Sequence, residues 1–533
     1  MTTLPRWNPP QALSTREARI YKRVEKKRKL FSFLRDHRHE LFDDEFQAEL
    51  EQMYRQTGAG KKEVSPALLA MALLLQGYSK ASDSEAVELA VCDARWRLVL
   101  GCLDTDEAPF SQGALFDFRE RLIAHDMDRR LLERTRELAR RTGAFDFKKL
   151  PKKLDVAVDS SPLEGAGRVE DTFNLLAHAA WKVVMCVAEL RGRPAELLVD
   201  ELGIPLLAEP SIKKALDVDW SDPEAKNAAL NRLLSQIEML EQWVATNLSK
   251  QVDKPPLKDQ LALLEQLREQ DLEPDPGGGG HRIARGVAKD RRVSVEDPDM
   301  RHGRKTKTKS FNGYKRHVAV ELDTKLILAV TIASANEPEK DSLPTLVDRM
   351  DQQGLELGAM YFDRGYIESS DVPELMADGV EIICKPWRQS NGDKFAKTDF
   401  EFDFAKSTVT CPGGQTRPMI LGEIARFEPD ICNTCELKSK CTTSDRGRGL
   451  RVAANEPLQA KLRVLQSSAD GRGRLRERVP IEHTLAHVSQ RQGNRARYLG
   501  KRKNEYDLTR AAVLVNLQVI RFELESSVHA NAA

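Results

Sequence analysis

The sequence predicts an α/β protein: a mixed sheet with a helical insertion and a cysteine-rich insertion, preceded by an all-helical N-terminal region. Leu154, Val156 and Val158 alternate with Asp155, Ala157 and Asp159, which is the two-residue period of a strand. Apolar strand patterns return at 317–322 and 326–332, whereas other long segments have apolar residues at helical spacing. We therefore expect a helical domain at 1–145 and an α/β domain at 146–523.

The size and composition of the chain indicate a folded protein of several parts. Its 533 residues are too many for one hydrophobic core and imply about two to four domains. A hydrophobic content of 41% and a charged content of 31% exclude a disordered chain. The net charge is only +1, so any basic face is local and is balanced by acidic regions elsewhere.

No membrane-spanning or secretion signal is expected. The longest apolar run, Ala67–Leu75, is too short to cross a bilayer, and the N-terminal MTTLPRWNPP lacks a signal pattern. We therefore expect a cytoplasmic protein with reduced thiols and no membrane partner. The dispersed cysteines lie in apolar surroundings and are expected to be small core residues: Cys92, Cys102, Cys186 and Cys384.

The helical N-terminal domain is expected to bind DNA or to support assembly. Ser65-Pro66 predicts the start of a buried helix, with Ser65 as N-cap and Pro66 at the first helical position. The basic stretch Tyr21–Lys29 can contact DNA, although an exposed helix face explains it equally well.

The first strand is expected to end at Asp159, because Ser160-Ser161-Pro162 follows. An insertion at about 176–280 has apolar residues at helical spacing in two stretches, 230–244 and 257–268, which predict a helical hairpin. The glycine-rich PDPGGGG at 274–280 is expected to be a flexible linker.

The remaining core elements follow in a regular order. After the strands at 317–322 and 326–332, we expect a helix at 341–352, a strand that ends at Asp363, a helix at 371–377 and a strand at 381–384. A cysteine-rich insertion occupies about 390–470. Helices are then expected at 481–490 and 508–523.

The cysteine-rich insertion carries a candidate metal site. Cys411, Cys432, Cys435 and Cys441 have the spacing C-x20-C-x2-C-x5-C. Four thiolates suit tetrahedral Zn²⁺, which we favour, and the same spacing also fits an iron–sulfur cluster. In either case the expected role is structural.

Two basic segments predict contact with a polyanion. The stretch from Arg301 to Lys315 contains no Asp or Glu and leads into a strand, and a second cationic run covers 491–503. Tyr498 can stack on a base or sugar, whereas Lys315 or Arg316 can instead be an ordinary sheet-edge charge. The candidate DNA-binding residues are Arg304, Lys305, Lys307, Lys309, Lys315, Arg478, Arg491, Arg495, Arg497, Tyr498, Lys501, Arg502 and Lys503.

Several motifs in order resemble one known family. They are Asp159-Ser160-Ser161-Pro162 with 171–175, Phe311-Asn312-Gly313-Tyr314-Lys315, Asp363-Arg364-Gly365-Tyr366, Arg478-Val479-Pro480-Ile481-Glu482 and the basic tail 495–504. Together they are similar to bacterial insertion-sequence transposases of the DDE type, over nearly the whole chain. This resemblance implies a ribonuclease H-like core and an N-terminal helical transposase domain.

The resemblance also implies that Asp159, Asp363 and Glu482 bind Mg²⁺ or Mn²⁺ and carry catalysis. The chain departs from the family at Leu475, where a Tyr is frequent, and at Ser489, where a Lys is frequent. Arg491 can take that basic role.

Each carboxylate also has an ordinary structural interpretation. An Asp at a strand end is usually a turn former. Asp363 can form an ion pair with Arg364, and Glu482 can be a solvated helix residue. Asp155 shares the strand face of Asp159 and is a weaker alternative to it.

The function expected from these features is transposition. The protein would bind double-stranded DNA at the ends of an insertion sequence, cleave it and join it to target DNA, as a homodimer on paired ends in the bacterial cytoplasm at the nucleoid. A ribonuclease H-like nuclease without strand transfer is one alternative. A catalytically inactive, domesticated DNA-binding protein is the other.

Overall fold

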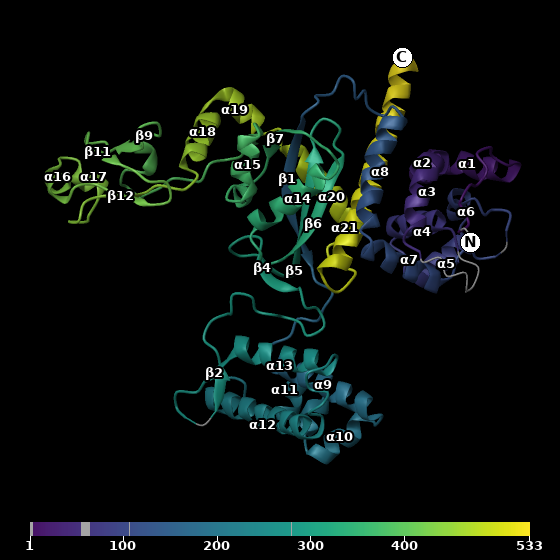
Figure 1. Cartoon of the computed structure of the whole chain (residues 1–533), viewed down its shortest axis with the longest axis horizontal. Helices are drawn as coiled ribbons and strands as arrows, with labels where there is room; N and C mark the ends of the chain where they lie inside the picture. The colour runs from purple at the N-terminus through teal and green to yellow at the C-terminus, as the bar shows by residue number, and fades with distance from the viewer. Residues whose placement is uncertain (1–3, 55–63, 106, 279, 533) are drawn as a thin grey trace.

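The centre of the molecule is a six-stranded mixed sheet (Figure 1). The computed structural model describes residues 4–54, 64–105, 107–278 and 280–532. The strand order is β4-β5-β1-β7-β8, and β6 pairs with β5 alongside β4. β1 is antiparallel to β5 and parallel to β7, and β8 is parallel to β7. The strands are β1 (Leu154–Glu164), β4 (Arg301–Arg304), β5 (Ser310–Glu321), β6 (Ile327–Ser334), β7 (Leu357–Tyr361) and β8 (Glu381–Ile383).

The expected end of the first strand at Asp159 is wrong, because β1 continues to Glu164. Beyond Ala157 the strand has lost its β7 neighbour and pairs with β5, from Ser160 opposite His317 to Glu164 opposite Gly313, and at its last residue Glu164 it also bridges to Arg495. A proline is tolerated where one side of a strand has no partner, so Pro162 does not stop β1. Asp159 therefore lies inside a strand, at the level where β7 has ended.

The helices around the sheet were largely expected. On one side lie the 3-10 helix η2 (Glu339–Ser342), α14 (Leu343–Asp351), η3 (Arg364–Tyr366) and α15 (Asp371–Ala377). α18 (Glu456–Ser467) and α19 (Ala469–Arg474) were not predicted, and both begin within the range 390–470 expected for the cysteine-rich insertion. α20 (Val479–Gln492) and α21 (Lys501–Ala532) contain the helices expected at 481–490 and 508–523.

The N-terminal region is helical, as expected. Its helices are α1 (Thr15–Lys27), α2 (Lys29–Leu41), α3 (Asp44–Glu51), α4 (Pro66–Ser79), α5 (Asp83–Cys92), α6 (Ala94–Leu100), α7 (Gln112–Ala124) and α8 (Met127–Arg141). Ser14 and Ser82 close capping boxes with Glu17 and Glu85. Ser65 precedes α4 as predicted, but its side chain makes no capping hydrogen bond.

One hydrophobic core joins the N-terminal helices to the sheet. Leu74 of α4 and Leu138 of α8 belong to the same cluster as Val513 of α21, Val318 of β5 and Val330 of β6. The long helix α21 runs between the N-terminal helices and the sheet (Figure 1). The helical region is thus packed against the α/β region rather than joined to it by a linker.

The helical insertion forms a separate bundle with its own core (Figure 1). It consists of α9 (Thr172–Arg191), α10 (Ala195–Leu202), η1 (Pro205–Ala208), α11 (Ile212–Leu216), α12 (Pro223–Asn247) and α13 (Leu257–Asp271). Among the described helices only α9 is long and apolar enough to cross a membrane, and 61% of that window is buried inside the protein. Burial of this kind is typical of a core helix.

The expected flexible linker at 274–280 is wrong in its described part. β2 (Leu272–Pro274) pairs antiparallel with β3 (His281–Ile283), so the glycine-rich stretch is the connection of a hairpin. Asn231 of α12 holds this hairpin, because its side chain binds both the amide and the carbonyl of His281.

The cysteine-rich insertion is a small module at one end of the molecule (Figure 1). Its core contains Phe400, Val409, Phe427 and Leu450. The elements, which sequence patterns did not predict, are β9 (Glu401–Asp403), β10 (Thr408–Thr410), β11 (Thr416–Pro418), β12 (Ile424–Arg426), α16 (Pro429–Thr434), α17 (Lys438–Cys441) and β13 (Gly449–Arg451).

Candidate active site

Strand register brings Asp159 and Asp363 side by side. Ala157 of β1 pairs with Tyr361 of β7, and each aspartate lies two residues beyond its member of this pair. Side chains two residues apart in a strand share a face, so both carboxylates lie on the face that Ala157 and Tyr361 turn to the shared core. Helix α20 covers this face of β1.

Arg478, the residue before α20, lies between the two aspartates. Its Nη1 is 3.5 Å from Asp159 Oδ2, and its Nη2 is 3.2 Å from Asp363 Oδ1. The side chain of Asp159 is 16% exposed, whereas that of Asp363 is 57% exposed. One cation is therefore shared between a largely buried carboxylate and an accessible one.

Burial dominates the electrostatics of Asp159. Loss of solvent raises the pKa of this carboxyl to about 6, although Arg478 and the amide of Ser160 both act to lower it. The carboxylates of Asp363 and Glu339 raise the pKa further. An additional positive charge would therefore stabilise the ionised carboxylates of this site.

Glu482 lies near the aspartates but does not form a three-carboxylate cluster with them. It is exposed on the first turn of α20, four residues after Arg478. A cleft of about 300 Å³ is lined by Asp363, Arg478 and Glu482. Within the described residues, no three His, Cys, Asp or Glu side chains are arranged to hold one metal ion.

The weaker alternative, Asp155, lies near the N-terminal end of β1 and has different neighbours. The Tyr361 hydroxyl donates to Glu477 at 2.7 Å and lies 3.4 Å from the Asp155 carboxylate. Burial raises the pKa of Asp155. The geometry thus pairs Asp159, not Asp155, with Asp363 and Arg478.

Sequence reasoning missed a polar group that supports the two aspartates. The Ser160 hydroxyl donates to Glu339 of η2 at 2.5 Å. Tyr366 is fully buried, and its hydroxyl contacts His317 Nδ1 at 2.7 Å. Burial lowers the pKa of His317 to about 3, so the imidazole is neutral. The sequence held one usable signal, the cluster of acidic residues that directly follows β6.

The basic hairpin between β4 and β5 has free positive charges. Arg304, Lys305, Lys307 and Lys309 are all exposed, and their side chains form no ion pair with any described residue. The hairpin holds its shape through backbone bonds from Lys305 and Thr306 to the Lys309 carbonyl. The Lys315 ammonium instead donates to the Glu337 carbonyl at 2.7 Å.

Most cations of the tail 491–503 are bound within the protein. Arg502 pairs with Asp126 and Asp128, Lys503 with Glu120, and Lys501 with Glu337. The remaining side chains contact aromatic rings or carbonyls: Arg491 on Tyr78, Arg495 on Gly165 and Ala166, Arg497 on Ala81, and Tyr498 beneath Arg119 and Arg497. This segment fastens α20 and α21 to the N-terminal helices.

The four clustered cysteines are half-buried free thiols in one neighbourhood. A Cβ at Gly413 would lie 3.2 Å from the Cys435 sulfur and 3.7 Å from the Cys411 sulfur. Burial first, and then the three other thiols, raise the pKa of Cys441. The donors are therefore close together, yet within the part of the chain that the structure describes they do not form an assembled metal site.

Two family models match parts of the chain. Residues 19–121 match the model described as Transposase domain (DUF772). Residues 410–521 match the model described as Transposase DDE domain. No curated protein and no solved structure gives a significant match.

Proposed function

Since the chain is an insertion-sequence transposase of the DDE family, we propose that it cleaves the ends of its own element and joins them to target DNA. The observation that carries this proposal is the position of Arg478 between Asp159 and Asp363. The positively charged guanidinium of Arg478 supports a cation-binding role for the two aspartates. Carboxylate oxygens from adjacent strands are the kind of ligand that Mg²⁺ or Mn²⁺ requires.

The sheet supports a ribonuclease H-like assignment for the core. If the core strands β1, β5, β6, β7 and β8 are numbered 1 to 5 in chain order, their order across the sheet is 3-2-1-4-5. Strand 2 is antiparallel to both of its neighbours, strands 1 and 3. The first strand is central, and the two aspartates come from it and from its parallel neighbour. We propose that the fold exists to hold this pair.

In this proposal Asp159 and Asp363 hold a divalent ion and Glu482 adds a third carboxylate from the edge of the cleft. Bound divalent ions activate a hydroxyl nucleophile and stabilise the charge of phosphoryl transfer. The protein's own part is to orient the carboxylates, to balance their charge through Arg478, and to keep Asp159 shielded from water.

DNA would approach from the side of the basic hairpin. Arg304, Lys305, Lys307 and Lys309 supply unpaired charge for phosphates. The cations of 491–503 would need to exchange their intramolecular partners to serve the same purpose, so we place the main contact at the hairpin. The thiols of the cysteine-rich module are proposed to hold structural Zn²⁺, and paired ends would require a homodimer.

The test is cleavage of a plasmid that carries the DNA flanking this reading frame. Asp363→Asn should abolish cleavage and retain DNA binding in a gel-shift assay, and exposed Asp378→Asn should resemble the parent. A pre-cut end should be joined to a second plasmid. Cleavage without joining would indicate a nuclease, and binding without cleavage by the parent would indicate an inactive DNA-binding protein.

A further inference from the structure

A second acidic residue, Glu339, connects the two segments that carry the catalytic aspartates. It belongs to η2, which follows β6 and packs against η3, the turn that begins directly after Asp363. Its Oε1 accepts the hydrogen bond from Ser160, the residue after Asp159. Glu339 thereby contacts the chain immediately beyond each aspartate.

The contact with the second segment depends on a glycine. A Cβ on residue 365 would lie only 2.0 Å from Glu339 Oε2, so the carboxylate occupies the space that Gly365 leaves open. The next residue, Tyr366, is fully buried, and its hydroxyl lies 2.7 Å from His317 Nδ1. The Glu339 carboxylate is partly exposed, and its two oxygens lie against the residues that follow Asp159 and Asp363.

We propose that Glu339 is a positioning residue that fixes the separation of Asp159 and Asp363. This inference rests on the proposed function, because it assigns to Glu339 the task of holding those two ligands for a divalent ion. Glu339 acts through hydrogen bonding and shape: one oxygen anchors Ser160, and the other fills the site over Gly365. Groups that orient metal ligands typically change metal affinity or activity about 10–100-fold when they are removed.

Three variants test this role. Glu339→Ala removes both contacts and should weaken Mn²⁺ binding and DNA cleavage about 10–100-fold. Glu339→Gln keeps an oxygen acceptor for Ser160 and should recover most of that loss. Gly365→Ala should fold normally, because the obstructing atom is the end of a flexible side chain, and should reproduce the defect by displacing the carboxylate.

The double variant distinguishes a shared mechanism from two separate ones. Gly365→Ala combined with Glu339→Ala should be no worse than Glu339→Ala alone, because both changes remove the same contact. Exposed Asp341→Ala, in the same turn, is the matched carboxylate control. Mn²⁺ affinity is measured by calorimetry on the full chain, independently of cleavage.

Several outcomes would overturn the proposal. Additive losses in the double variant, or unchanged Mn²⁺ affinity in Glu339→Ala, would show that Glu339 does not position the pair. If Glu339→Gln were as defective as Glu339→Ala, the carboxylate itself would be the ligand. Failure of the proposed function is a different result, since Asp363→Asn would then cleave DNA like the parent.

Discussion

Asp363 and Arg478 form an ion pair at 3.2 Å, and the same guanidinium contacts the more buried Asp159. Arg478 cannot fully balance both carboxylates, because the pKa of Asp159 remains raised to about 6. The ionised form of Asp159 is thus disfavoured, and binding of a proton or of a divalent ion would stabilise the site.

Asp159→Asn should stabilise the metal-free protein at neutral pH. The folded-state pKa of about 6 exceeds the ordinary aspartate value of 3.8, so the folded state holds the extra proton between these values and loses stability as pH rises through them. A shift of this size corresponds to about 3 kcal/mol at pH 7 and to none below pH ~4. Urea unfolding with EDTA at both pH values measures the difference. Equal stabilisation at both would contradict the electrostatic cause.

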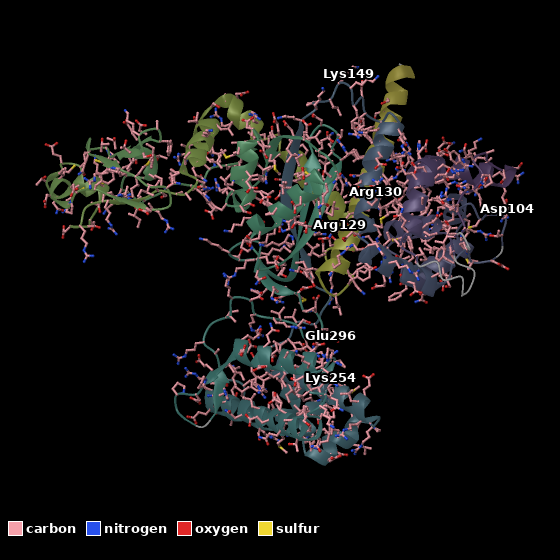
Figure 2. All side chains as sticks on the ribbon, viewed as in Figure 1. Asp104, Arg129, Arg130, Lys149, Lys254 and Glu296 are labelled. Carbon is pink, nitrogen blue, oxygen red and sulfur yellow. The ribbon has the colours of Figure 1, made fainter. Side chains whose placement is uncertain are left out.

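Glu505→Gln should destabilise the junction between the N-terminal helices and the sheet. The Glu505 carboxylate pairs with Arg129 at 3.0 Å and with Arg349 at 2.8 Å (Arg129 is labelled in Figure 2). Loss of this buried partner leaves Arg349 uncompensated, at a cost of about 3 kcal/mol.

Because the pKa of Glu505 is lowered, its contribution to stability is present above the unfolded value and is lost as pH falls. The deficit of the Gln variant should therefore shrink in acid. Urea unfolding measures it, and exposed Glu269→Gln on α13 is the control.

A triple Lys305, Lys307 and Lys309→Ala variant should weaken DNA binding, and most strongly at low salt. Each phosphate contact contributes about 0.9 to the slope of log K against log salt, so the slope should fall by about 2–3. Fluorescence anisotropy over a salt series measures it. Replacing Lys250, Lys254 and Lys258, which are exposed on the helical insertion, should leave the slope unchanged (Lys254 is labelled in Figure 2).

Cys411→Ser should remove a bound zinc ion from the purified protein. Thiolate is the preferred ligand for structural Zn²⁺, and the Cys411 sulfur is near that of Cys435. Metal content by mass spectrometry should give one zinc per parent chain. A brown protein with visible absorbance would instead indicate an iron–sulfur cluster, and buried Cys384→Ser should not alter the metal content.

The sequence predicted the elements of the core well, because apolar periodicity is local. The strands that hold His317 and Ile327, the helix at 371–377 and the aspartate after β7 lie where the patterns put them. The family resemblance drawn from the motifs is confirmed by the two transposase models. The triad remains a prediction, although the structure brings two of its members together.

Tertiary pairing decided what the sequence could not. β1 passes Pro162 because β5 continues beside it after β7 has ended, and this depends on residues far away along the chain. The cations at 491–503 resemble free charge until Asp128 and Glu120 are placed opposite Arg502 and Lys503. The position of Glu339 could not be predicted from local sequence patterns, because its partners Ser160 and Gly365 lie far from it along the chain.

The core shared by the N-terminal helices and α21 has a consequence for biosynthesis. Leu74 and Leu138 reach their full packing only when Val513 and its neighbours are present. The ribosome releases the N-terminal helices first, and the part of their apolar surface that packs against α21 stays uncovered until residues beyond 500 have been made. Folding of this protein is therefore completed after most of the chain has been translated. Truncated products would expose the hydrophobic surface that α21 covers, and such a surface is a target for proteases and chaperones.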